Sequence, residues 1–104
     1  MFGTSDAPPP ATPELHVQRA ADEREATVSI TPVPGALGYN IRWGVAPDRL
    51  FLTYQIYDDE LADIDERVQV RALNTGVDYW FAVEAFSPGG VSALSEVAAV
   101  PAAD

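Results

Sequence analysis

The sequence predicts an all-β fold, a seven-stranded antiparallel β-sandwich. Apolar and polar residues alternate with a period of two from Glu14 onward, which is typical of strands that bury one face. Turn-forming residues separate these stretches about every 8–12 residues, as in two-sheet sandwiches. No stretch repeats with the period of a helix, so we expect no helix.

The first 13 residues, MFGTSDAPPPATP, predict a proline-rich linker, and residues 14–104 the domain itself. Pro8, Pro9 and Pro10 favour extended polyproline geometry, and nothing in this stretch alternates. Such segments join domains, so we expect the chain to come from a longer protein. A polyproline docking site is the weaker alternative, because basic and aromatic flanking residues are missing.

The first three strands are each marked by alternate apolar residues. These are Leu15 and Val17 in the first, Ala26, Val28 and Ile30 in the second, and Tyr39, Ile41 and Trp43 in the third. Pro32-Val33-Pro34-Gly35 separates the second strand from the third, because neither proline can donate to a ladder. Ala46-Pro47-Asp48-Arg49 has the composition of a type I turn after the third.

Four more strands follow. The run LFLTYQIY, Leu50–Tyr57, is rich in β-branched and aromatic residues and predicts the fourth, although its pattern leaves open which side faces the core. The acidic stretch Asp58–Glu66 predicts a loop. The remaining strands are expected at Val68 and Val70, from Tyr79 to Phe86 and, after the turn Ser87-Pro88-Gly89-Gly90, from about Ser92 to Val100.

Composition excludes several classes of function. The formal net charge is −10, from 16 acidic and 6 basic residues, and such a surface repels phosphate backbones. We therefore expect no nucleic-acid partner. No apolar run reaches the length of a membrane-spanning helix, so no membrane insertion is expected. The absence of cysteine excludes disulfides and thiolate metal sites, and Met1–Ser5 lacks the features of a signal peptide.

The most specific local motif is Leu73-Asn74-Thr75-Gly76-Val77-Asp78-Tyr79. It resembles the tyrosine corner of fibronectin type III domains, in which the tyrosine hydroxyl reaches back to the main chain of the E–F connection. Gly76 allows the tight turn, and Leu73 fills the space beneath Tyr79. Two departures are Ile30, where the family usually has tryptophan, and Thr75, where the motif often has proline.

The resemblance continues along the chain from about residue 14 to residue 100. Alternate residues from Tyr79 to Ala85 match strand F of the family, and Tyr39, Ile41 and Trp43 match strand C. It implies strands A, B and E in one sheet and C, C′, F and G in the other. The segments Gly38–Leu50, Tyr54–Asp58 and Arg71–Ser92 are also similar to the type III-like modules of secreted bacterial glycoside hydrolases.

We expect no catalytic site and no cofactor in this chain. A glycosidase needs two carboxylates across a cleft, whereas the acids here form charge runs. His16, the only histidine, is expected on an exposed face. The acidic side chains of Asp58–Glu66 can offer oxygen ligands to calcium, but the spacing of a calcium loop and its glycine are missing. We expect a solvated charge run and no metal site, with calcium as the alternative.

The outward face of strands C and F is the candidate binding or docking face. If Tyr79 faces the core, then Trp80, Glu84 and Phe86 face outward, and Arg42 can pair with Glu84 or lie over Trp80. Three interpretations stay open: a docking face for a neighbouring domain, an aromatic platform for a sugar ring helped by Tyr54 or Tyr57, or a closed surface on which Arg42 covers Trp80.

The resemblance implies a non-catalytic spacer module of a secreted, bacterial, polysaccharide-degrading enzyme, with neighbouring domains as partners. The alternatives are a weak carbohydrate-binding module, whose partner is a polysaccharide, and a protein-recognition module of a cell-surface protein. The export signal of the parent protein is expected outside this sequence.

Overall fold

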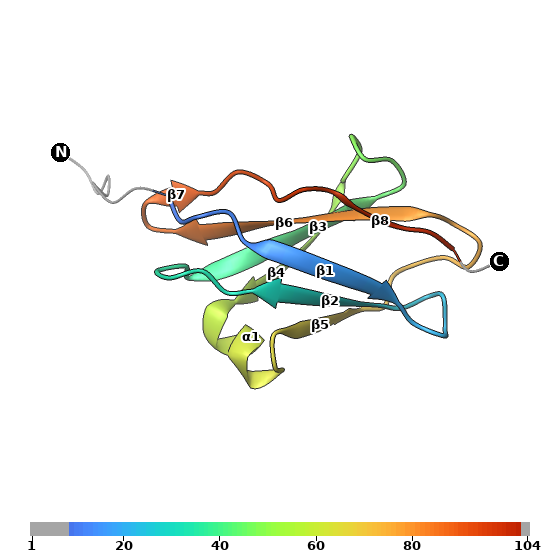
Figure 1. Ribbon diagram of the computed structural model, residues 1–104, viewed down its shortest axis with the longest axis horizontal. Coiled ribbons are helices and arrows are strands. Elements are labelled where there is room, and N and C mark those ends of the chain that lie inside the picture. Colours follow the sequence, from blue (N-terminus) through green and yellow to red (C-terminus); the bar gives the residue numbers. More distant parts are fainter. Residues whose placement is uncertain (1–8, 103–104) are drawn as a thin grey trace.

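The computed structural model describes residues 9–102, which form two packed antiparallel sheets (Figure 1). One sheet has the order β1-β2-β5, from Glu14–Arg19, Ala26–Thr31 and Arg67–Val70. The other has the order β4-β3-β6-β7, from Leu52–Tyr57, Gly38–Gly44, Tyr79–Ser87 and Gly90–Val91, and β8, Ala98–Val100, also pairs with β6. The predicted sandwich and its division into two sheets are confirmed.

The core lies between the inner faces of the two sheets. Ile30 is buried where the family usually has tryptophan, and Trp43 stacks on Phe81 with ring centroids 5.8 Å apart. The large indole on β3 thus adds bulk to the core opposite the smaller Ile30 side of the sandwich.

The acidic stretch after β4 contains a short helix, α1, Asp58–Asp63, so the prediction of a loop without helix was wrong. Leu61 is fully buried and anchors the helix where the chain crosses from one sheet to the other. Asp58, Asp59 and Glu60 lie in the first turn of the helix, where their negative charges interact favourably with the positive end of the helix dipole. Six residues are too few to reveal a helical period in the sequence.

Of the strand predicted from about Ser92 to Val100, only Ala98–Val100 forms a strand, β8; β7 lies before it at Gly90–Val91, and the segment between them is irregular. There Ser92 donates its N–H to Ala85 O at 2.8 Å, while its Oγ accepts the Ala85 N–H at 2.9 Å. Ser95 bonds in the same two ways to Val83, at 2.8 and 2.9 Å. Serine hydroxyls therefore accept the hydrogen bonds of β6 that strand carbonyls would otherwise accept. The segment after β7 is irregular, but these N–H groups of β6 still have acceptors.

The two ends of the described chain lie at opposite ends of the long axis of the molecule (Figure 1). Near the first end Pro13 is buried, whereas the first eight residues of the predicted linker lie outside the described residues. At the second end the Asp78 carboxylate accepts the N–H of Ala102 at 2.8 Å. Within residues 9–102 no helix is long and apolar enough to cross a membrane.

Candidate functional site

The candidate face is the side of the β4-β3-β6 sheet that points away from the core, and we call it the outer face. Strand register aligns its residues in rows across the sheet. The rows are Trp80 with Gly44, Ala82 with Arg42 and Thr53, Glu84 with Asn40 and Gln55, and Phe86 with Gly38 and Tyr57. Trp80, Arg42, Glu84, Phe86 and Tyr57 therefore share one face.

An ion pair occupies the middle of the outer face. Glu84 is only 7% exposed, and its Oε1 lies 3.1 Å from Arg42 Nε. Its Oε2 accepts hydrogen bonds from Arg42 Nη2 at 3.2 Å and Asn40 Nδ2 at 2.9 Å. Both oxygens of this buried carboxylate are therefore occupied by Arg42 and Asn40, which leaves neither oxygen free to contact a ligand.

Two aromatic rings meet at one end of the outer face. Tyr57 and Phe86 pack edge to face with ring centroids 6.1 Å apart. Gly38 makes this possible, because a Cβ there would lie 2.7 Å from Phe86 Cζ and 2.6 Å from Ile56 O. Beside Tyr57 the surface is hollowed by about 560 Å³ between Leu37 and the acidic first turn of α1. This combination of an exposed ring and nearby carboxylates is the most ligand-like feature of the face.

Trp80 lies apart from this pair. It lies six positions before Phe86 on β6, which corresponds to about 20 Å along a strand. The Arg42–Glu84 pair stands between them, and Trp80 is only partly exposed. The outer face therefore offers two separate aromatic positions, not one continuous platform.

Tyr54 is on the other side of the sheet. It is the register partner of Ile41, so it points toward the core side of β4 together with Leu52 and Ile56. It remains half exposed because β4 is the edge strand of its sheet. Tyr54 therefore cannot assist Trp80 or Phe86, and Tyr57 alone of the two tyrosines lies with them.

The corner residues lie at the opposite end of the molecule from α1. Leu73 is buried, Gly76 has a φ of +75°, and the Tyr79 hydroxyl accepts the N–H of Asn74 at 2.9 Å. This is the reach-back that the spacing of leucine, glycine and tyrosine predicts.

Sequence reasoning missed Arg19, which closes the same end. Its guanidinium lies 5.4 Å from the centroid of the Tyr79 ring. It donates to the carbonyl oxygens of Glu23 (2.8 Å), Asn74 (3.0 Å), Val77 (3.0 Å) and Val100 (3.2 Å). The only signal in the sequence is a basic residue that continues the inward-facing positions of Leu15 and Val17.

Tyr39 and Asp58 form a second contact that the sequence did not reveal. The Tyr39 hydroxyl accepts the Val33 N–H at 3.1 Å and donates to Asp58 Oδ1 at 2.8 Å. Burial, followed by the hydrogen bond to Asp58, raises the pKa of Tyr39 to about 12. Asp58 is thus a structural acceptor, and the described residues contain no group of three or more potential metal ligands.

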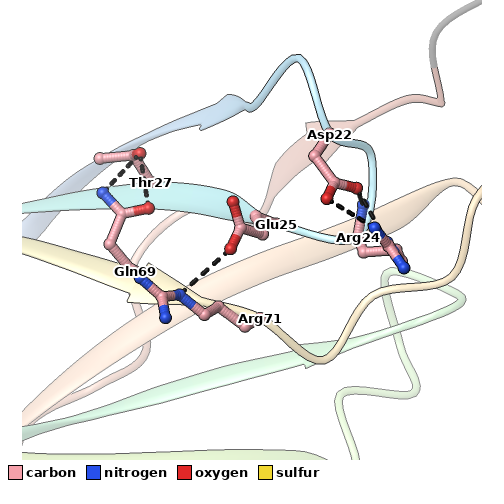
Figure 2. A network of polar contacts seen from close by, with 6 residues as sticks. All are labelled: Asp22, Arg24, Glu25, Thr27, Gln69 and Arg71. Carbon is pink, nitrogen blue, oxygen red and sulfur yellow. Dashed lines mark hydrogen bonds and ion pairs between the residues drawn. The ribbon is translucent and has the colours of Figure 1, made fainter.

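The outer side of the β1-β2-β5 sheet is polar (Figure 2). Thr27 and Gln69 exchange side-chain hydrogen bonds of 3.1 and 3.3 Å across β2 and β5. At the exposed turn before β2, hydrogen bonds from Arg24 lower the pKa of Asp22, and the same contacts raise the pKa of Arg24. His16 is exposed on this side, as predicted.

No protein-family model and no curated protein matches the sequence. Solved structures do match in fold. An Fn3-like protein from Clostridium thermocellum has a TM-score of 0.70 at 19% identity, covering 96% of this chain and 97% of that one. The fn3 domain of human contactin 1 has a TM-score of 0.73 at 20% identity, covering 97% and 87%.

A structure of the FN1-FN3 domains of chicken CNTN1 has a TM-score of 0.73 at 21% identity. It matches 89% of this chain, which spans 31% of that longer chain. The two sheets, the tyrosine corner and these likenesses together give this chain the fibronectin type III fold.

Proposed function

We propose that this chain is a non-catalytic spacer module that sets the geometry between neighbouring domains of a secreted, bacterial, polysaccharide-degrading enzyme. The observation that carries the proposal is the position of the two chain ends at opposite ends of the long axis (Figure 1). A module that the chain enters at one end and leaves at the other holds the neighbouring domains apart. The bacterial, carbohydrate-related parent follows from the motif resemblance, and the likeness to a Clostridium thermocellum protein supports only its bacterial part.

The fixed exit of the chain supports the same role. Arg19 binds Val100 O at 3.2 Å, and Asp78 binds the N–H of Ala102 at 2.8 Å. The direction in which the chain leaves β8 is therefore set by the domain itself. At the other end Pro13 is buried, and the proline run before it favours a stiff, extended linker.

The test uses the longest natural chain that carries this sequence. We would replace residues 14–102 by a flexible Gly/Ser linker and measure hydrolysis of insoluble polysaccharide and of a soluble oligosaccharide. A spacer predicts a loss on the insoluble polymer only, with an increased spread of interdomain distances in small-angle scattering. Equal activity and equal scattering profiles would contradict the proposal.

A second candidate function, weak carbohydrate binding, is favoured by the hollow beside Tyr57. A sugar ring can stack on this half-exposed tyrosine while Asp59 and Glu60 accept its hydroxyl hydrogens. Affinity electrophoresis against arabinan, xylan and cellulose tests it, with Tyr57→Ala and Trp80→Ala as matched variants. Retardation that Tyr57→Ala abolishes would make this chain a carbohydrate-binding module, and retardation that only Trp80→Ala abolishes would move the site to the other end of the outer face.

A further inference from the structure

The edge of β4 is the least protected strand edge among the described residues. Within residues 9–102, β4 pairs with β3 on one side and with no strand on the other. The backbone N–H and C=O groups on that other side are available to another strand. Four side chains around this edge are exposed, Phe51 by 83%, Tyr57 by 51%, and Leu52 and Tyr54 by 47% each.

The other edges carry features that hinder strand pairing, and β1, at the free side of the other sheet, has the charged Glu14 and Arg19 at its ends. β5 has four residues, begins with Arg67 and is followed by Arg71, and both of these charges are exposed. β7 has two residues, and the irregular segment that bonds through Ser92 and Ser95 follows it. In contrast, the run from Leu50 to Tyr57 has no charged residue, no proline and no glycine.

The chemistry of this run is the same in both directions. From Phe51 to Tyr57 it reads aromatic, aliphatic, polar, aromatic, polar, aliphatic, aromatic, with Tyr54 at the centre. If two copies pair antiparallel with Tyr54 opposite its own equivalent, Leu52 lies opposite Ile56 and Thr53 opposite Gln55. Phe51 then lies opposite Tyr57. Every position meets a side chain of its own kind, which stabilises cross-strand pairs.

Charge and symmetry favour a second copy of this chain as the occupant. Arg49 precedes the run and Asp58 and Asp59 follow it, so antiparallel pairing brings opposite charges together at both ends. A two-fold axis perpendicular to the sheet keeps Leu52, Tyr54 and Ile56 of both copies on one side. A shift by one residue would place side chains of opposite faces together and break the symmetry.

We propose that β4 is a homodimerisation edge, at which two copies pair antiparallel about a two-fold axis at Tyr54. The pairing uses the free edge of each copy, so association stops at the dimer. A contact of one strand edge is small for a stable complex, and two copies each of net charge −10 repel each other. The dimer is therefore weak and becomes stronger as salt screens the repulsion.

Sedimentation equilibrium of the complete chain at rising concentration and two salt concentrations tests the proposal. Tyr54→Lys places two like charges on the axis and is expected to raise the dimer dissociation constant at least about tenfold. Val91→Lys is the matched control, because Val91 is 53% exposed at the opposite edge of the same sheet. A wild type that stays monomeric to about millimolar concentration, equal effects of the two variants, or open-ended oligomers would each overturn the proposal.

Disulfide crosslinking tests the register. The chain has no cysteine, so a single introduced cysteine can form a disulfide only between copies. Residues directly opposite in an antiparallel pair have Cα atoms about 4.5–5.5 Å apart, which suits a disulfide. We expect Tyr54→Cys to crosslink at least about tenfold faster than Val91→Cys, and an equimolar mixture of Thr53→Cys and Gln55→Cys to form mixed dimers. Equal rates for Tyr54→Cys and Val91→Cys would overturn the proposal.

Discussion

The same kind of tyrosine hydrogen bond closes both ends of the sandwich, but the charged group beside the tyrosine differs between them. At each end a buried tyrosine accepts the backbone N–H of the connection before its strand, Tyr79 from Asn74 at 2.9 Å and Tyr39 from Val33 at 3.1 Å. We call these the corner end and the helix end. At the corner end the guanidinium of Arg19 lies over the tyrosine ring, whereas at the helix end Tyr39 donates its own hydrogen to a carboxylate, that of Asp58.

The difference shows that one hydrogen-bond pattern can depend on local or distant residues. The corner end is largely encoded within seven residues, Leu73 to Tyr79. The helix end requires Asp58, 19 residues after Tyr39, to be brought back by β4 and α1. Four mutational comparisons test this contrast.

The largest expected effect concerns the two buried leucines that support the ends. Leu73→Ala and Leu61→Ala should each lower the free energy of unfolding by ~2–5 kcal/mol, because each leaves a cavity in the core. Ile64→Ala is the control, since Ile64 is 44% exposed and should cost far less. Urea denaturation measures all three. A Leu61→Ala variant as stable as Ile64→Ala would show that α1 is not an integral part of the core.

The second comparison uses pH at the helix end. The pKa of Tyr39 is raised from 10.0 to about 12, so between these values the folded protein binds a proton that the unfolded chain has lost. The contribution of Tyr39 is therefore complete below pH 10 and is lost as pH rises through about 12. The stability difference between wild type and Tyr39→Phe should shift by roughly 2 kcal/mol against the wild type over this range. If the urea denaturation midpoints of wild type and Tyr39→Phe changed in parallel from pH 9 upward, the prediction would be wrong.

The third comparison concerns Arg19 at the corner end. Arg19→Met keeps much of the apolar stem but leaves four carbonyl oxygens without their donor, so we expect a loss of about 2 kcal/mol. Arg24→Met is the matched control, because Arg24 makes its salt bridge on an exposed turn. Its loss should be much smaller, because an exposed ion pair contributes little to stability. Equal thermal stability of the two variants would show that Arg19 does not close the corner end.

Most of the fold follows from local pattern. The alternation of β1, β2, β3 and β6 marks their buried faces directly, and the spacing of Leu73, Gly76 and Tyr79 marks the corner. The helix Asp58–Asp63 could not be predicted in this way, because six residues with one buried side chain, Leu61, show no helical period. The break between β7 and β8 depends on serine hydroxyls that bond to β6, a partner that only the tertiary structure identifies.

The residues of the outer face could be predicted only on strands whose sequence distinguishes the inward side from the outward side. The alternation of β6 and β3 placed Trp80, Glu84 and Arg42 on one face, but it left open whether Arg42 pairs with Glu84 or lies over Trp80. The structure shows the pair with Glu84. The pairing of Tyr57 with Phe86 depends on the register between β4 and β3. The sequence left the facing of that strand open, and for the same reason it did not separate Tyr54 from Tyr57.

The smallest effect separates the two hydroxyls themselves. Tyr79→Phe removes one hydrogen bond, that from the exposed Asn74, and water can replace the lost oxygen, so we expect a loss of about 1 kcal/mol. Tyr39→Phe at neutral pH removes two bonds and leaves Asp58 without its donor, so its loss should be the greater. Urea denaturation of both variants at pH 7 decides between them. If Tyr79→Phe lowered the free energy of unfolding more than Tyr39→Phe, the prediction would be wrong. The single hydrogen bond of the corner end would then contribute more to stability than the two hydrogen bonds of the helix end.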